Sequence, residues 1–204
     1  MSDRVQAVIF DIGNVLVRWD PRALYERLIS DTEELDWFLT HVVTLAWHTH
    51  HDAGRPLDEG IRLLTRRYPA YADLIAAFKP RWDDTIIGPI EGSVRLLEAL
   101  DDAGVPVYAV TNYSAETFPA FRRDFPFARR FRDVVVSGQH GVVKPDPRIY
   151  DIALRRFATT PARTVFIDDR PDNVSGAEAK GLIGLPFTGP ERLASDLRAL
   201  GLPV

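Results

Sequence analysis

The sequence contains no cysteine among its 204 residues, which excludes disulfides, thiolate metal sites and catalysis by a thiol. No stretch approaches the about 18 consecutive apolar residues of a transmembrane helix, so we expect no contact with a membrane. The first residues, MSDRVQ, include no apolar signal region. These absences indicate a cytoplasmic enzyme or binding protein.

The sequence also lacks a large excess of either positive or negative charge. The chain has 25 Lys and Arg against 29 Asp and Glu, and this net charge of −4 gives no reason to expect binding to nucleic acid. Apolar residues make up 46% of the chain, as in an ordinary globular protein. The length is sufficient for one sizeable core, or for a core with a small inserted domain.

The C-terminal half alternates between short apolar runs and helical patterns. With the N-terminal run, these predict strands at residues 5–10, 106–110, 133–136, 164–167 and 182–187. The segments between them predict helices at residues 91–102, 114–124, 171–180 and 190–200, and one more helix that Asp146 caps and Pro147 opens. Buried strands that alternate with helices predict an α/β fold with a doubly wound, Rossmann-like parallel sheet.

Residues 20–86 have a different pattern, without a convincing strand. Four apolar side chains of this segment fall on one face of a predicted helix: Leu57, Ile61, Leu64 and Tyr68. We interpret the segment as an all-helical cap inserted into the α/β core. The predicted core domain is then residues 1–17 and 88–204, and the predicted cap is residues 18–87.

Polar residues follow three of the predicted strands: Asp11, Thr111 with Asn112, and Asp168 with Asp169. In an open parallel sheet, ligands bind beyond the carboxyl ends of the strands, so these side chains should converge on one edge. Lys144 lies just before the helix that Asp146 caps, and its side chain should be able to reach the same edge.

Each of these residues has an ordinary structural explanation when it is taken alone. Thr111 and Asn112 would cap a helix or form a turn, and Lys144 would be a solvated loop residue. The adjacent carboxylates of Asp168 and Asp169 are harder to explain, because they repel each other unless a cation or a lysine lies between them. The joint occurrence of all these residues at the strand ends therefore favours a functional site.

The chemistry that suits this set is phosphoryl transfer to a small-molecule substrate. Asp11 is the candidate nucleophile, because a carboxylate can form an acyl-phosphate. Mg²⁺ would offset the charge of the phosphate, with Asp11, Asp169 and the backbone carbonyl of Gly13 as candidate ligands. The Thr111 hydroxyl and backbone N–H groups would hold phosphate oxygens. Lys144 would neutralise the phosphate and keep Asp11 ionised.

Four segments of the chain resemble the motifs of a known family. FDIGNVLV, VTN, VVKPDPRIY and FIDDRPDN, in that order, are similar to the four motifs of the haloacid dehalogenase superfamily. The predicted insert resembles its small helical cap, so the resemblance extends over nearly the whole chain. It implies a Mg²⁺-dependent phosphatase. The first and last motifs look most like those of phosphatases that act on α-D-glucose 1-phosphate, which implies a sugar phosphate as substrate.

The resemblance also implies a role for each matching residue. These roles are Asp11 as the nucleophile, Thr111 and Asn112 for phosphate binding, Lys144 as the lysine of the third motif, and Asp169 for Mg²⁺. Asp168 and Asp172 are implied as further metal ligands or as partners of the ligands.

Gly13 departs from the family pattern. Most phosphatases of the family have an aspartate at this position, which protonates the leaving oxygen and later activates water. A sugar 1-phosphate suits an enzyme without that acid, because the anomeric hydroxyl is more acidic than an ordinary alcohol. We therefore expect a steep dependence of the first step on the pKa of the leaving group.

Three other functions are compatible with parts of this pattern. The dehalogenases of the family also lack the second aspartate, but they use no metal and have no acidic pair in the last motif. A catalytically inactive phosphate-binding protein of the same fold is a second alternative. A receiver domain is a third, although its acidic pair comes early in a shorter chain.

The predicted cap contains the candidates for substrate specificity. Four histidines lie close together in the sequence: His41, His48, His50 and His51. On a helix His48 and His51 share a face, whereas His50 points away. A zinc site, a surface that faces the substrate and plain surface histidines all remain open. Arg55 and Arg81 are further candidates, and we interpret three aromatic residues as packing inside the cap: Trp47, Phe78 and Trp82. The oligomeric state is not predicted.

Overall fold

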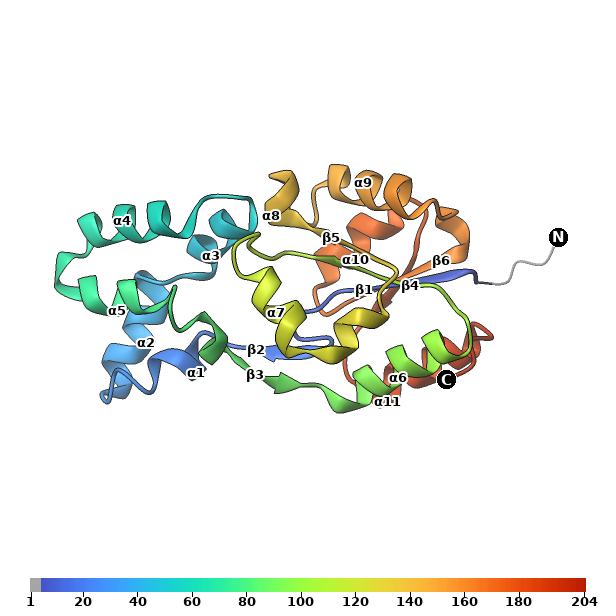
Figure 1. Ribbon diagram of the computed structural model, residues 1–204, viewed down its shortest axis with the longest axis horizontal. Helices are drawn as coiled ribbons and strands as arrows, with labels where there is room; N and C mark the ends of the chain where they lie inside the picture. The colour runs from blue at the N-terminus through green and yellow to red at the C-terminus, as the bar shows by residue number, and fades with distance from the viewer. Residues whose placement is uncertain (1–4) are drawn as a thin grey trace.

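Five parallel strands form the central sheet of the computed structural model, which describes residues 5–204 (Figure 1). Their order across the sheet is β5-β4-β1-β6-β7. The strands are β1 (Ala7–Phe10), β4 (Val107–Thr111), β5 (Asp133–Val136), β6 (Thr164–Asp168) and β7 (Ile183–Pro186). The doubly wound α/β fold predicted from the sequence is confirmed. Residues 1–4 of the predicted core domain lie outside the described residues.

The sheet separates two layers of helices, because successive side chains of a strand point to opposite faces. Val8 and Phe10 of β1 belong to the same apolar cluster as α6 (Glu91–Asp102) and α11 (Pro190–Ala199). Ile9 belongs to a second cluster, with α9 (Pro147–Phe157) and α10 (Pro171–Glu178). The remaining core helices are α7 (Phe118–Asp124), α8 (Ser137–His140), η3 (Pro126–Arg130) and η4 (Pro161–Arg163).

A helical insert follows β1 and forms one end of the molecule, to the left of the sheet in Figure 1. Its helices are α1 (Arg22–Tyr25), α2 (Thr32–His41), α3 (Leu45–Asp52), α4 (Leu57–Arg67), η1 (Pro69–Tyr71), α5 (Ala72–Ala77) and η2 (Trp82–Thr85). Over residues 5–204, no helix combines the length and the apolar character that crossing a bilayer requires.

Two short antiparallel strands, β2 (Val17–Trp19) and β3 (Ile86–Pro89), connect the insert to the core. The sequence analysis missed this pair. Most of their side chains are only partly buried or exposed, so neither segment shows a run of core residues, and their pairing depends on a partner far away in the sequence. The predicted domain boundaries, at residues 18 and 87, fall inside these two strands.

The helix predicted at residues 114–124 begins later, at Phe118. A proline has no backbone N–H and is tolerated only in the first turn of a helix, and Pro119 lies in that turn. Residues 114–117 instead form a loop between β4 and α7, where Glu116 donates its backbone N–H to the Ser114 hydroxyl over 3.2 Å. This loop becomes part of the pocket described below.

Candidate active site

Lys144 lies at the centre of a buried charged cluster at the carboxyl edge of the sheet. Its side chain is 0% exposed, and its ammonium group has three acceptors at hydrogen-bond distance. These acceptors are Asp11 Oδ1 at 2.8 Å, Asp168 Oδ2 at 2.7 Å and the Val110 carbonyl at 2.8 Å. Each of the three N–H groups of the ammonium therefore has an acceptor, and the three acceptors come from the ends of three neighbouring strands.

The strand register explains why these groups meet. Phe10 of β1 pairs with Ile167 of β6, so the residues that follow them, Asp11 and Asp168, lie side by side at the carboxyl edge of the sheet. The backbone N–H of Asp11 also donates to the Ile167 carbonyl over 2.8 Å. The predicted convergence of strand-end residues on one edge is thus present in the fold.

Burial and charge act in opposite directions on the groups of this cluster. Burial alone would lower the pKa of Lys144, but Asp11 and Asp168 outweigh it and raise that pKa, so Lys144 is a cation. Burial raises the pKa of Asp11 to about 7, while Lys144 opposes the rise and Asp168 adds to it. Without Lys144, the folded protein would hold Asp11 in its protonated form over a wide pH range.

Asp168 has different surroundings from its neighbour Asp169. It is fully buried, and its Oδ1 accepts hydrogen bonds from the Arg170 backbone N–H and from Asn173 Nδ2, each over 2.9 Å. Together with the bond from Lys144, these contacts hold Asp168 against the start of α10. Its oxygens are already occupied by protein donors, so Asp168 positions Lys144 and is poorly suited to bind a metal directly.

A carboxylate oxygen each of Asp11, Asp168 and Asp169 lies within 4.8 Å of the other two. Within residues 5–204, this is the only group of histidine and carboxylate side chains close enough to hold a metal ion. Burial and the charge of Asp168 raise the pKa of the half-buried Asp169, which a cation would relieve. The hard oxygen donors fit Mg²⁺, and Asp11 and Asp169 are the two that remain available.

Other residues predicted for the site have structural partners of their own. Asn112 uses its side chain to hold the loop of Lys144: its Oδ1 accepts from the Lys144 N–H over 2.8 Å, and its Nδ2 donates to the Lys144 carbonyl over 3.1 Å. Thr111 is buried as the last residue of β4. Asp172 is not part of the cluster of three carboxylates. It pairs with Arg170 over 2.9 Å at the surface.

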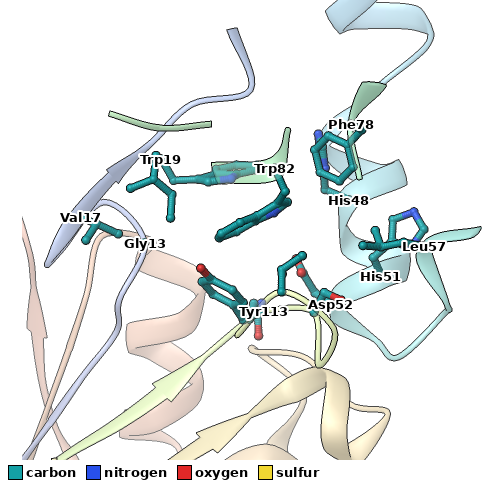
Figure 2. A pocket seen from close by; sticks show the side chains of 14 residues that line it. Gly13, Val17, Trp19, His48, His51, Asp52, Leu57, Phe78, Trp82 and Tyr113 are labelled. Carbon is teal, nitrogen blue, oxygen red and sulfur yellow. The ribbon is translucent and has the colours of Figure 1, made fainter. Parts of the chain in front are cut away.

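A cavity of about 90 Å³ lies between the core and the insert, and it reaches Gly13, two residues after Asp11. The core contributes Gly13, Asn112, Tyr113, Ser114 and Thr117, and the insert with its connecting strands contributes Val17, Trp19, His48, His51, Asp52, Leu57, Phe78, Trp82 and Ile86. Figure 2 shows Trp19 and Trp82 on one side of this cavity and Tyr113 and Asp52 on the other. Most of the wall is aromatic or aliphatic.

The predicted specificity residues divide between this cavity and other places. His48 and His51 line it and are buried, whereas Arg81 pairs with Asp84 over 2.8 Å and Arg55 borders a separate hollow in the insert. Burial lowers the pKa of His48 to about 3, so this ring is neutral. It packs against Trp19 with 5.3 Å between ring centroids.

Phe78 and Trp82 also line the cavity, which differs from their interpretation as packing inside the cap. Trp47 does pack inside the insert, where its indole N–H donates to the Gly60 carbonyl over 3.4 Å. The sequence analysis did not identify Trp19, Asp52 or Tyr113 as parts of the site. Their periodicity is that of ordinary strand, helix and loop residues, so nothing in the sequence alone distinguishes them.

Comparison with known proteins identifies the family. A family model of haloacid dehalogenase-like hydrolases matches residues 5–181. The chain is a hydrolase of this family. It is 30% identical over 201 residues to the sesquiterpene phosphatase astK of Aspergillus oryzae, which covers 98% of each chain. It is also 31% identical over 115 residues to flavin mononucleotide hydrolase 1 of Arabidopsis thaliana, over 56% of this chain and 46% of that protein.

Solved structures show the same fold at low sequence identity. The HAD family enzyme bt-2542 of Bacteroides thetaiotaomicron, in complex with magnesium and inorganic phosphate, has a TM-score of 0.69 at 18% identity, over 91% of this chain and 95% of that one. The L-2-haloacid dehalogenase of Xanthobacter autotrophicus has a TM-score of 0.65 at 18% identity, over 96% and 83%. Both enzymes therefore share the fold of this chain, and the fold alone does not decide between phosphatase and dehalogenase chemistry.

Replacement of Lys144 by methionine should destabilise the protein in a pH-dependent way. It leaves Asp11 and Asp168 buried without their counterion, and breaking a buried pair in this way costs about 3–5 kcal/mol. The folded-state pKa of Asp11, already raised to about 7, would rise further, so the part of the loss that comes from Asp11 should be absent below about pH 7 and grow as the pH rises above it. Urea unfolding at several pH values measures it.

Lys79→Met is the matched control, because Lys79 is 38% exposed and pairs with surface carboxylates. Its loss should stay within about 0.5 kcal/mol at every pH. A pH-independent loss in Lys144→Met would contradict the counterion role.

Proposed function

We propose that this protein is a Mg²⁺-dependent phosphatase in which Asp11 becomes phosphorylated. The observation that carries the proposal is the buried cluster in which Asp11 bonds to Lys144 and lies within 4.8 Å of Asp169. Lys144 favours the ionised, nucleophilic form of Asp11. When bound, Mg²⁺ supplies positive charge that offsets the charge of the phosphoryl group.

The remaining roles are assigned to the chain's own residues. Asp11 attacks phosphorus and displaces the alcohol, and water then attacks the phospho-aspartate and releases inorganic phosphate. Lys144 offsets negative charge beside Asp11 throughout. The Thr111 hydroxyl and the backbone N–H groups of the loop after β4 would hold phosphate oxygens. Asn112 contributes mainly by fixing the Lys144 loop, because both ends of its side-chain amide are used there.

A phosphatase is favoured over a 2-haloacid dehalogenase by the carboxylates themselves. Asp11 and Asp169 form an acidic surface that would repel a substrate carboxylate unless a cation lies between. The similar protein from Aspergillus oryzae is named a phosphatase and the one from Arabidopsis thaliana a hydrolase of flavin mononucleotide, which supports the same reading. An inactive phosphate-binding protein remains the alternative that turnover itself would exclude.

We further propose that the group attached to the phosphate is apolar. The resemblance of the motifs predicts a sugar 1-phosphate, but a sugar needs hydrogen-bonding partners for its hydroxyls. The insert side of the cavity and its connecting strands present mainly apolar side chains: Trp19, Leu57, Phe78 and Trp82. Such walls stabilise a bound hydrocarbon group by removing its surface from water. The relative named as a sesquiterpene phosphatase, which matches over nearly the whole chain, supports this substrate class.

Asp11→Asn should reduce phosphatase activity to background, because it removes the nucleophilic charge while keeping the size of the side chain. A chelator should silence the wild-type protein, and Mg²⁺ should restore it. Phosphate release from an aryl phosphate measures both effects, with the unfolding midpoint as the control for folding. Retention of a tenth of the activity, or full activity in chelator with halide release from a 2-haloacid, would contradict the proposal.

Trp82→Ala should lower kcat/KM selectively for apolar substrates. Burial of a large apolar surface contributes about 1.5–3 kcal/mol, so the expected loss is roughly 10- to 100-fold for prenyl or geranyl phosphate. Glucose 1-phosphate and glucose 6-phosphate should be poor substrates of the wild type. The control is Trp37→Ala, because Trp37 is 40% exposed on α2 and lies outside the cavity. A wild-type preference for glucose 1-phosphate would instead support the sugar phosphate.

A further inference from the structure

The missing carboxylate at Gly13 leaves the reaction without an acid for the leaving oxygen. An apolar alcohol is a poor leaving group, so its departure as a free alkoxide would be slow. Four ionisable side chains line the cavity that reaches Gly13: His48, His51, Asp52 and Tyr113. One of these side chains has both the position and the protonation state that are needed to supply the proton.

Neither histidine suits this role. His48 is buried and neutral, and it is enclosed by the rings of Trp19, Trp47 and Phe78. His51 directs Nδ1 to the Arg55 carbonyl at 3.1 Å, and burial lowers its pKa too. The His51 ring also packs directly over Gly60 of α4, where a Cβ atom would lie 2.0 Å from it, so this ring faces the interior of the insert.

Tyr113 is a poor acid, since burial raises its pKa well above the ordinary value. Its hydroxyl is buried and has no hydrogen-bond partner within the described residues. It is suited to donate a hydrogen bond to a bound substrate, but not to give up its proton at neutral pH.

Asp52 is the last residue of α3, and its backbone is anchored to the core. Its carbonyl accepts a hydrogen bond from Ser137 Oγ over 2.6 Å, and the same Oγ accepts from the Tyr113 N–H over 2.9 Å. This links the end of α3 to the loop that follows β4, beside the residues that hold Lys144. Figure 2 shows Asp52 facing the cavity next to Tyr113. The side chain is therefore held at the cavity wall by a fixed backbone.

The Asp52 carboxyl group is free of protein partners. Among residues 5–204, no hydrogen-bond donor and no cation within 4.0 Å is paired with it, although most other aspartates around the site have such a partner. Burial raises its pKa to about 7, and the charge of Lys144 opposes that rise. A carboxyl group in this state is protonated in a substantial fraction of molecules at neutral pH and can both give and take a proton.

We propose that Asp52, supplied by the insert, is the general acid and base of the reaction in place of the residue missing at Gly13. This assignment rests on the proposed phosphatase function. In the first step, Asp11 forms a bond to phosphorus, the ester P–O bond breaks, and the Asp52 proton passes to the leaving oxygen to give the alcohol. In the second step, the Asp52 carboxylate takes a proton from water, whose oxygen attacks phosphorus. The bond to Asp11 breaks, inorganic phosphate leaves, and Asp52 is protonated again.

The substitution Asp52→Asn tests this role with little change in shape. Single-turnover rates are measured for a series that runs from aryl phosphates with acidic phenols to alkyl phosphates. Loss of a general acid costs ~10²–10⁴-fold for poor leaving groups and little for good ones. We expect a loss of this size on the alkyl esters, a small change on the aryl esters, and a steeper dependence on leaving-group pKa than in the wild type. Asp58→Asn, at a 78% exposed side chain on α4, is the matched control and should change nothing.

A second variant makes the test specific. A Cβ atom at Gly13 would meet no atom within 4 Å, so the backbone there has open space for the start of a side chain. Gly13→Asp in the Asp52→Asn background should restore the alkyl phosphate rate, because it returns an acid to the site from the core side. A merely structural role of Asp52 would not be rescued in this way. Asp52→Glu, which keeps a carboxyl group, should retain more activity on alkyl esters than Asp52→Asn.

The outcomes separate the two proposals. A single-turnover release of phenol from an aryl phosphate that needs Asp11 but survives in Asp52→Asn supports the phosphatase function whatever Asp52 does. An unchanged rate and leaving-group dependence in Asp52→Asn would overturn the role of Asp52 alone. Equal losses on aryl and alkyl esters, or a failure of the Gly13→Asp rescue, would also overturn it. Absence of turnover in the wild-type protein on every ester would overturn the phosphatase function itself.

Discussion

The bonding of Lys144 to two carboxylates is the interaction on which the rest of the site depends. A buried ammonium group is costly unless acceptors surround it, and Lys144 has Asp11, Asp168 and the Val110 carbonyl at 2.7–2.8 Å. These partners come from three adjacent strands, so the ion cluster also fixes their relative positions at the carboxyl edge of the sheet. Asp168 extends the same network to the start of α10 through Asn173. The same contacts thus balance the charges of the cluster, position its side chains and hold the strand ends together.

The second constraint is the contact between the insert and the core. The paired strands β2 and β3 carry the insert, and side-chain to backbone hydrogen bonds then hold it against the sheet edge. Ser137 bonds to Asp52 over 2.6 Å, and Glu116 accepts from the Leu57 N–H over 2.8 Å. The core supplies the charged cluster, whereas the insert supplies most of the apolar wall. The charged cluster and most of the apolar wall therefore lie on different parts of the chain, and they meet only at this contact.

Much of the fold was predictable from local patterns. The run DVVV at residues 133–136 forms a strand with the predicted bounds, and Asp146 with Pro147 begins a helix as predicted, because both signals depend on the residues themselves. The helix after β4 was predicted too early, and the β2–β3 pair was missed. The later start of the helix follows from Pro119, which is tolerated only in the first turn, whereas a non-local contact decided the β2–β3 pair. Strands of three and four residues with little burial are defined by their partner rather than by their own sequence.

The sequence by itself determined the charged cluster of this protein. Parallel strands of a doubly wound sheet end at one edge, so the topology alone brings Asp11, Asp168 and Asp169 together, and a lysine must neutralise them. Only the tertiary structure decided which groups the side chains of Asn112 and Asp52 face. The Asn112 amide turned towards the Lys144 backbone because that loop lies within hydrogen-bond distance. Asp52 ends an ordinary helix, and it faces the cavity because the insert docks on Ser137, a contact 85 residues away that no local pattern encodes.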